Sequence, residues 1–383
     1  MPKSPQAEPA SPTDQTRFPD PERSEALLTV DLDALASNHA YLKRQAGAAE
    51  VAPVVKADAY GLGATEVARR LHLEGARTFF VARVSEGEAL RRALGAQPAE
   101  IYVLDGALPG VAGRLEAAAL TPVLNSLEQV RTWSAQARGG PSLPAALHID
   151  TGMNRLGLTV EEAETLARDA QTFAGLRLQT VMSHLACAEE ADNPSNPRQL
   201  SLFASVRPLF PNARASLCNS AGLFLGEDYH FDLARPGISL YGGGPRGAPD
   251  LNLSAVATFE APLLQVRHAR PGETVGYGCA YAVTHSMRIG ILAAGYADGA
   301  LRSGWKNGKA VLHGRPCPVL GRISMDLIAV DVSDVEAAPG DLVQLLGPEA
   351  LLDDVATAAG TISYELLTRL SNRAERRYLG RAD

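Results

Sequence analysis

The chain has 383 residues, enough for one large domain and a smaller one. Its 46% hydrophobic and 21% charged residues are typical of a globular enzyme, and its formal net charge of −7 argues against nucleic acid or an anionic membrane as the main partner. No apolar run approaches a membrane span and the four cysteines form no C-x-x-C pair, so we expect no membrane anchor, metal site or disulfide framework, and a reduced, cytoplasmic setting.

Residues 1–24 are rich in proline, serine and charge and lack the apolar segment of a secretory signal, so we expect a disordered leader. Residues 25–245 begin with a short strand and an amphipathic helix. Eight short apolar runs then alternate with helical patterns: 51–55, 78–84, 100–104, 120–124, 146–150, 178–184, 215–219 and 231–237. This alternation predicts a parallel sheet, and eight units fit a closed, TIM-like (β/α)8 barrel. An open doubly wound sheet is the alternative.

The pattern changes after the Gly/Pro-rich stretch 241–252. From there the chain shows strand-like runs broken by turns, followed by short helical patterns at 353–360 and from residue 364. We therefore expect residues 246–383 to form a mainly β C-terminal domain.

Polar side chains occur where the predicted barrel strands end. In a parallel barrel these ends meet at the C-terminal face, where catalytic residues lie. The side chains at this face are Lys56, Arg155, His184, Asn219, Ser220 and Arg235. The face shows no acidic pair of the kind that a glycosidase needs.

Lys56 ends the apolar run 51–55, so its amine is expected to enter the barrel mouth. A desolvated lysine has a lowered pKa and can form a Schiff base or act as a general base. The residues after it, KADAYGLGA, bring Tyr60 close by. Together with Ser220 and the backbone at Gly237, Tyr60 could bind a phosphate with few positive charges. Taken alone, Lys56 could equally be a strand-end lysine whose amine reaches solvent.

Nine motifs occur in an order that resembles the fold-type III alanine racemases. They are VVKADAYGLGA, HIDTGMNRLG, SHLACA, CNSAG, ARPGISLYG, VGYGCAY, GYADG, GRISMD and TISYEL. The resemblance covers nearly everything after the leader. It implies pyridoxal 5′-phosphate as cofactor and racemisation of alanine, which supplies D-alanine for peptidoglycan.

By this resemblance, Lys56 forms the Schiff base with the cofactor and Arg235 faces its pyridine nitrogen. The phosphate-binding set is Tyr60, Ser220, Gly237, Ile238 and Tyr364, with Asn219 and His184 steadying it. Arg155 is expected to reach the cofactor's phenolic oxygen and the substrate carboxylate.

The resemblance also implies a second base, Tyr277, supplied by the partner subunit of a homodimer with shared active sites. Tyr296, Met325 and Asp326 complete the substrate site from the same partner. Racemisation needs a proton removed from one face and returned to the other, and one base on each face achieves this. Because tyrosine is ordinarily a weak base, a hydrogen-bond route from Tyr277 through His184 to Arg235 is expected to assist it.

One position departs from the family pattern. Where many members have a lysine that carries a carbamate and orients the substrate arginine, this chain has His148, so we expect no carbamate and another support for Arg155. Alternative functions are a broader racemase acting on serine, lysine or arginine, a decarboxylase of the same fold, and a non-catalytic barrel that carries the cofactor. In isolation, each of these side chains could serve packing or a surface ion pair.

Overall fold

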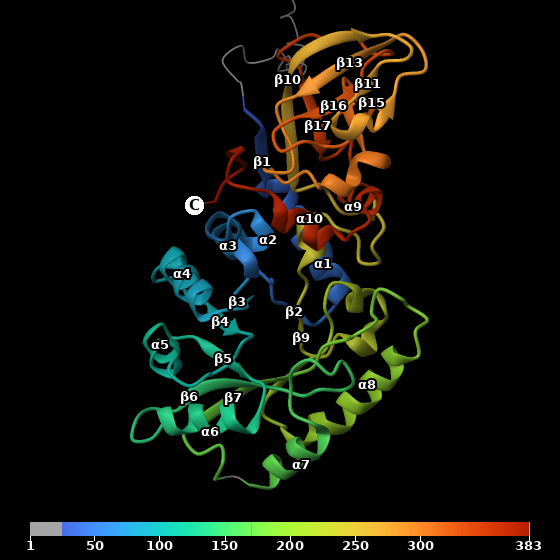
Figure 1. Ribbon diagram of the computed structural model, residues 1–383. Coiled ribbons are helices and arrows are strands. Elements are labelled where there is room, and N and C mark those ends of the chain that lie inside the picture. The colour runs from blue at the N-terminus through green and yellow to red at the C-terminus, as the bar shows by residue number, and fades with distance from the viewer. Residues whose placement is uncertain (1–24, 170, 383) are drawn as a thin grey trace, which may run out of the picture.

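The computed structural model describes residues 25–169 and 171–382 and shows an α/β part at one end and a β-rich part at the other (Figure 1). The leader expected at residues 1–24 lies outside the described residues. Within the described residues, every helix is too short or too polar to serve as a membrane-spanning segment.

Eight parallel strands form the α/β part within the described residues. They are β2 (Glu50–Val51), β3 (Thr78–Val81), β4 (Glu100–Val103), β5 (Thr121–Leu124), β6 (Leu143–His148), β7 (Leu176–Met182), β8 (Arg214–Ser216) and β9 (Leu233–Ala234). Strands β3 to β8 follow one another in one sheet, and β2 pairs with β9.

Backbone hydrogen bonds close these strands into a barrel. Phe80 N–H donates to Pro53 O at 2.9 Å, which joins β3 to the segment after β2, and Asp232 N–H donates to Ala215 O at 3.0 Å, which joins β9 to β8. The closed (β/α)8 prediction is therefore confirmed, and the open-sheet alternative is not.

Helices follow most of the strands and cover the barrel. Asp31 begins α1 (Leu32–Ala46) by accepting hydrogen bonds from two N–H groups of its first turn, and Thr159 forms a capping box with Glu162 at the start of α7 (Val160–Arg168). Further helices around the barrel are α3 (Ala64–Leu73), α4 (Val84–Leu94), α5 (Ala112–Ala117), α6 (Leu127–Gln136) and α8 (Ser195–Val206).

The second part is mainly β, as predicted. Its strand order is β15 (Arg315–Pro318), β14 (Lys309–Leu312), β17 (Leu342–Leu346), β10 (Ala257–Ala269), β1 (Leu27–Asp31) and β18 (Glu375–Leu379), while β13 (Met287–Leu292) and β16 (Ile328–Asp331) extend from β10. Two helices complete it, α9 (Leu352–Ala359) and α10 (Ser363–Arg369).

Strand β1 precedes the barrel in the sequence but belongs to this second sheet. It pairs antiparallel with β10 and parallel with β18, and Leu28 and Val30 are buried there. The range 25–245 expected for the barrel thus begins with a strand of the other part, because β1 needs β10 and β18 to complete its backbone hydrogen bonds.

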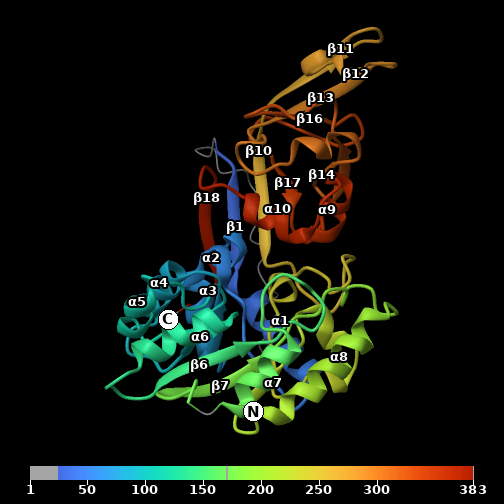
Figure 2. The ribbon, with the colours of Figure 1, turned by 60° about the horizontal axis from the view of Figure 1, so that its bottom comes forward.

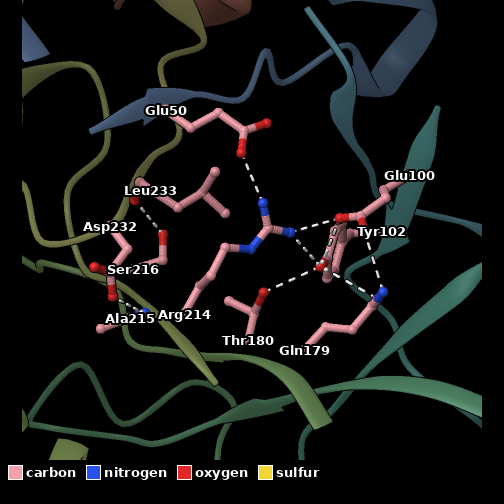
Figure 3. A network of polar contacts seen from close by, with 10 residues as sticks. All are labelled: Glu50, Glu100, Tyr102, Gln179, Thr180, Arg214, Ala215, Ser216, Asp232 and Leu233. Atoms are coloured by element: carbon pink, nitrogen blue, oxygen red, sulfur yellow. Dashed lines mark hydrogen bonds and ion pairs between the residues drawn. The ribbon is translucent and has the colours of Figure 1, made fainter. Parts of the chain in front are cut away.

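An ionic network fills the barrel at the N-terminal ends of its strands (Figure 3). Arg214 contacts Glu50 at 2.7 Å and Glu100 at 2.5 Å, and it donates to Tyr102 Oη at 3.0 Å. Tyr102 also contacts the Thr180 hydroxyl at 3.0 Å. These residues come from four different strands. They lie at the N-terminal face of the barrel, opposite the C-terminal face where the candidate catalytic residues are, and in such barrels the N-terminal face serves stability.

Replacing the central cation of this network, in Arg214→Met, should lower the free energy of unfolding by about 1–3 kcal/mol, because two partly buried carboxylates lose their partner. Urea unfolding measures the change. The control is Arg168→Met, since Arg168 makes only an exposed pair with Glu164, and its effect should stay within about 0.5 kcal/mol. Equal effects of the two substitutions would contradict a structural role for the network.

Candidate active site at the mouth of the barrel

The side chains expected at the strand ends gather at one face of the barrel. Electrostatic effects connect them: His184, which follows β7, is influenced by Arg235, Arg155, His148 and Lys56. These five residues come from four strand ends, since His148 ends β6 and Arg155 lies in the loop after it, so their proximity is a product of the barrel.

Lys56 is followed by a short left-handed turn, α2 (Lys56–Gly61). Four consecutive non-glycine residues, 57–60, have φ between 51° and 58°. Left-handed backbone costs an L-residue about 1–2 kcal/mol, and such strain concentrates at functional sites. Two carboxylates hold the turn: Glu86 accepts from Ala57 N–H at 2.9 Å, and Asp58 accepts from Ala64 N–H at 2.7 Å.

The Lys56 amine lies in an environment that favours its neutral form. Burial lowers its pKa, and the positive charge of Arg155 lowers it further, against smaller opposing effects of Glu86 and Asp105. An amine with a lowered pKa is a better nucleophile and general base near neutral pH.

Ser220, Gly237, Ser239 and Tyr60 form a cluster of polar groups, called the cup below, which the turn after Lys56 joins through Tyr60. The Ser220 hydroxyl accepts hydrogen bonds from Gly237 N–H at 2.9 Å and Ser239 N–H at 3.3 Å, at the start of the 3₁₀ turn η4 (Ile238–Tyr241). A Cβ atom on residue 237 would lie only 2.2 Å from Tyr60 Oη, so the close approach requires glycine. Ser239 Oγ is sealed from solvent and has no hydrogen-bond partner.

Tyr60 borders the cup on the side of Gly237. It is buried, its ring centroid lies 5.8 Å from that of Tyr364 in α10, and burial raises its pKa above the ordinary value, so it remains a hydrogen-bond donor. The turn and α10 are in close contact, because a Cβ on Gly61 would lie 2.8 Å from the carbonyl oxygen of Leu367. Figure 1 shows α10 against α2, so the second part of the chain contributes directly to the cup.

Arg235 is a buried cation without an acidic partner among the described residues. Only 4% of it is exposed, and it donates to Ser183 O at 2.6 Å, to Leu217 O at 3.3 Å and to the Ser216 hydroxyl. Burial lowers its pKa to about 10, which leaves it charged near neutral pH. It also approaches His184 Nδ1 at 3.4 Å, and burial and this charge lower the pKa of His184 well below its ordinary value.

Arg155 and His148 lie at the same mouth. Arg155 is exposed, and its guanidinium makes no hydrogen bond or ion pair within the described part of the chain. His148 is buried and contacts Asn125 Oδ1 through Nδ1 at 2.8 Å. Asn219 accepts a hydrogen bond from Gly222 N–H at 2.9 Å, which shapes the loop that carries Ser220.

The remaining candidates lie elsewhere. Tyr277 is 71% exposed and begins the turn η5 (Tyr277–Cys279) between β11 (Thr274–Val275) and β12 (Tyr281–Ala282). Figures 1 and 2 both place this hairpin at the end of the β-rich part farthest from the barrel. Within one chain the structure does not bring Tyr277 to Lys56.

Tyr296, Met325 and Asp326 lie on neighbouring loops of the β-rich part. Tyr296 N–H donates to Ser324 O at 3.0 Å, which joins the two loops, and Asp326 forms an ion pair with Arg373 at 2.8 Å. Tyr296 is 43% and Met325 53% exposed, so large apolar side chains face outwards here.

Three supporting residues were not anticipated from the sequence. Glu86 holds the turn after Lys56, Asn125 holds His148, and Tyr241 donates to Val54 O at 2.9 Å with its ring 4.9 Å from that of Tyr60. Tyr241 and Asn125 could have been found, because the first lies in the motif ARPGISLYG and the second directly follows the predicted strand 120–124. Glu86 carries no such signal.

The chain matches the family models "Alanine racemase, N-terminal domain" over residues 30–245 and "Alanine racemase, C-terminal domain" over residues 256–378. It is 46% identical to an alanine racemase of Rhodospirillum rubrum (94% of this chain, 97% of the relative) and 46% identical to a catabolic alanine racemase of Agrobacterium fabrum (92% of each). Among solved structures, it resembles the alanine racemase of Bartonella henselae with covalently bound pyridoxal phosphate, with a TM-score of 0.87 and 36% identity over 93% of this chain and 100% of that one.

Proposed function

This chain belongs to the alanine racemase family, and from that premise we propose that it works with pyridoxal 5′-phosphate bonded to Lys56 and with Tyr277 of the partner subunit as a second base. The reaction is the interconversion of L-alanine and D-alanine, an isomerase activity. The decarboxylase and the non-catalytic carrier are set aside, since the chain matches racemases over more than nine-tenths of its length.

One feature above all supports the cofactor: the Lys56 amine, with its lowered pKa, is followed four residues later by Tyr60, whose hydroxyl lies against Gly237 in a cup that could hold a phosphate. Tyr60 O–H, Ser220 O–H and the backbone N–H groups of Gly237 and Ile238 would hold the phosphate, and the Tyr364 ring closes over Tyr60. When bound, the cofactor withdraws electrons from the substrate α-carbon and so makes loss of the α-proton possible.

Lys56 would act on one face of the substrate. With its lowered pKa, its Nζ could take the α-proton from one enantiomer or return it to give that enantiomer. Arg235 would donate to the cofactor's ring nitrogen without giving up its proton, because its pKa of about 10 stays well above neutral. Asn219 and His184 would steady these groups from the loops beside them.

The second face needs a base that this chain alone does not supply. Tyr277 is exposed and far from Lys56 in its own chain, so we propose a homodimer in which the β-rich part of one subunit covers the barrel mouth of the other. Tyr296, Met325 and Asp326 would then enter the same site from the partner and limit the size of the substrate. Arg155 would bind the substrate carboxylate as a charge-assisted pair.

Substitution of the proposed second base, in Tyr277→Phe, should reduce racemisation by about 10²–10⁴-fold, the usual contribution of a positioned general base. The cofactor absorption band should remain, because Tyr277 is not part of the phosphate cup. Tyr281→Phe, four residues away on β12, is the matched control and should retain activity. Full activity of Tyr277→Phe would remove this residue from the mechanism.

Mixing two inactive variants tests the shared site. A heterodimer of Lys56→Ala and Tyr277→Phe subunits contains one site with both bases intact only if each site is built from two chains. Random exchange should then restore roughly a quarter of wild-type activity, since half of the dimers are mixed and half of their sites are intact. Kinetics after unfolding and refolding the mixture measure this, and no recovery would indicate sites within single chains.

Adding a methyl group to the cup, in Gly237→Ala, should weaken cofactor binding by about tenfold or more, because the new Cβ collides with Tyr60 Oη. Spectroscopic titration of the apoenzyme with pyridoxal phosphate gives the Kd. The control is Gly113→Ala in α5, where nothing lies within 4 Å of an added Cβ. An unchanged Kd in Gly237→Ala would argue against this cup as the phosphate site.

Substrate breadth is tested by racemisation assays with alanine, serine, lysine and arginine. A site narrowed by Met325, Tyr296 and Tyr364 should favour alanine. Comparable kcat/KM for lysine or arginine would instead support the broader racemase.

A further inference from the structure

The last strand of the chain, β18, contacts the turn that follows Lys56. Tyr378 in β18 donates from Oη to Leu62 O at 3.1 Å, where α2 ends. The contact is close, because a Cβ on Gly63 would overlap Tyr378 Oη. Tyr378 is half-buried, and burial raises its pKa above the ordinary value, so its hydroxyl stays protonated and can donate.

A second side chain of β18 reaches the same turn. Arg376 lies two residues before Tyr378 and therefore on the same face of the strand. Its Nη1 is 3.7 Å from Asp58 Oδ2 inside the turn, and Asp58 Oδ1 accepts from Ala64 N–H at 2.7 Å. Arg377, between the two, is exposed, and its side chain makes no hydrogen bond or ion pair within the described residues. One face of β18 is thus directed to the turn.

Strand β18 lies at the edge of the β-rich sheet. It pairs with β1 alone, and just beyond it Arg70 of α3 donates to Arg381 O at 3.3 Å. Figure 2 shows β18 beside β1, with the ends of both strands near α2. A strand held by one neighbour opens more readily than a central strand, so its docking can respond to the state of the turn.

The turn needs contacts of this kind, because residues 57–60 are all left-handed and such backbone persists only where its surroundings hold it. The turn begins at Lys56 and contains Tyr60, so a displaced turn would move both the amine and the border of the cup. Contacts that hold the turn therefore favour binding at these two residues.

We propose that β18 positions the cofactor site, with Tyr378 as the main contact and Arg376 as a lesser one. Both are positioning residues. The proposal rests on the proposed binding of pyridoxal phosphate at Lys56 and Tyr60. Coupling between two sites is reciprocal, so if β18 favours cofactor binding, bound cofactor must hold β18 in place by the same factor.

Titration of the full-length apoenzyme with pyridoxal phosphate gives the first readout. Tyr378→Phe keeps the ring but removes the donor, and it should raise the Kd by about 2- to 10-fold, the range for one hydrogen bond. Arg376→Met should change the Kd by no more than about twofold, because Asp58 is largely exposed. Arg377→Met is the matched control on the opposite face and should leave the Kd unchanged. An unchanged Kd in Tyr378→Phe would overturn the proposal.

Hydrogen exchange followed by mass spectrometry gives the second readout, in the wild-type apo and holo forms. Amides of 375–379 should exchange more slowly when cofactor is bound, and this difference should shrink in Tyr378→Phe, while amides of 57–64 should exchange faster in that variant. Tyr102→Phe is the structural control, since its hydroxyl belongs to the network at the opposite face of the barrel, and it should leave the cofactor-dependent difference intact. Equal exchange of 375–379 in wild-type apo and holo protein would show that β18 and the cofactor are not coupled.

The outcomes separate this proposal from the proposed function. If Lys56→Ala loses the cofactor absorption band but Tyr378→Phe keeps the wild-type Kd and exchange, then the cofactor site stands and the role of β18 is wrong. If Lys56→Ala keeps the band, the proposed function fails, and the role of β18 in positioning that site fails with it.

Discussion

The site depends on the buried guanidinium of Arg235, which has no carboxylate partner among the described residues. Arg235 is almost completely enclosed by the barrel, and its hydrogen bonds within the described residues go to carbonyl oxygens, a serine hydroxyl and a histidine nitrogen. A buried charge of this kind is costly unless hydrogen bonds and neighbouring charge compensate it. The barrel provides the hydrogen bonds, and an anionic cofactor would provide the charge. Burial is the main reason that His148 and His184 are neutral, and the charge of Arg235 lowers the pKa of each histidine further.

A second constraint joins the two parts of the molecule. The left-handed turn after Lys56 is strained, and α10 of the β-rich part packs against it so closely that Gly61 cannot carry a side chain. Strained backbone persists only where its surroundings hold it firmly. Glu86 holds the turn from the barrel side and α10 from the other, which places the Tyr364 ring against Tyr60. The β-rich part thus shapes its own chain's barrel mouth as well as carrying the exposed Tyr277.

Much of this arrangement can be predicted from the sequence. The eight barrel strands follow from short apolar runs alternating with helical patterns, and Lys56, His184 and Arg235 stand out because each ends a run with a polar group. The placement of β1 in the second sheet cannot be read locally, because its partners β10 and β18 are more than 200 residues away. The left-handed turn cannot be predicted from the sequence either, since none of its residues Ala57, Asp58, Ala59 and Tyr60 is a glycine, which would favour this backbone conformation. The role of Glu86 in holding the turn cannot be predicted for the same reason.

The carboxylates near the barrel mouth do not neutralise its arginines, because they accept hydrogen bonds from backbone N–H groups. Asp150 accepts hydrogen bonds from Gly152 N–H and Met153 N–H, and Glu86 accepts from three backbone N–H groups, one of them in the turn after Lys56. The nearby acids are therefore engaged in shaping loops, and none forms an ion pair with Arg155 or Arg235 among the described residues. Arg155 and Arg235 thus present an excess of positive charge beside Lys56 and two neutral histidines. Such a site would suit anionic groups, and the charge of Arg155 adds to the effect of burial in lowering the pKa of the Lys56 amine. Arg155 is therefore suited both to recognition of an anion and to activation of the base.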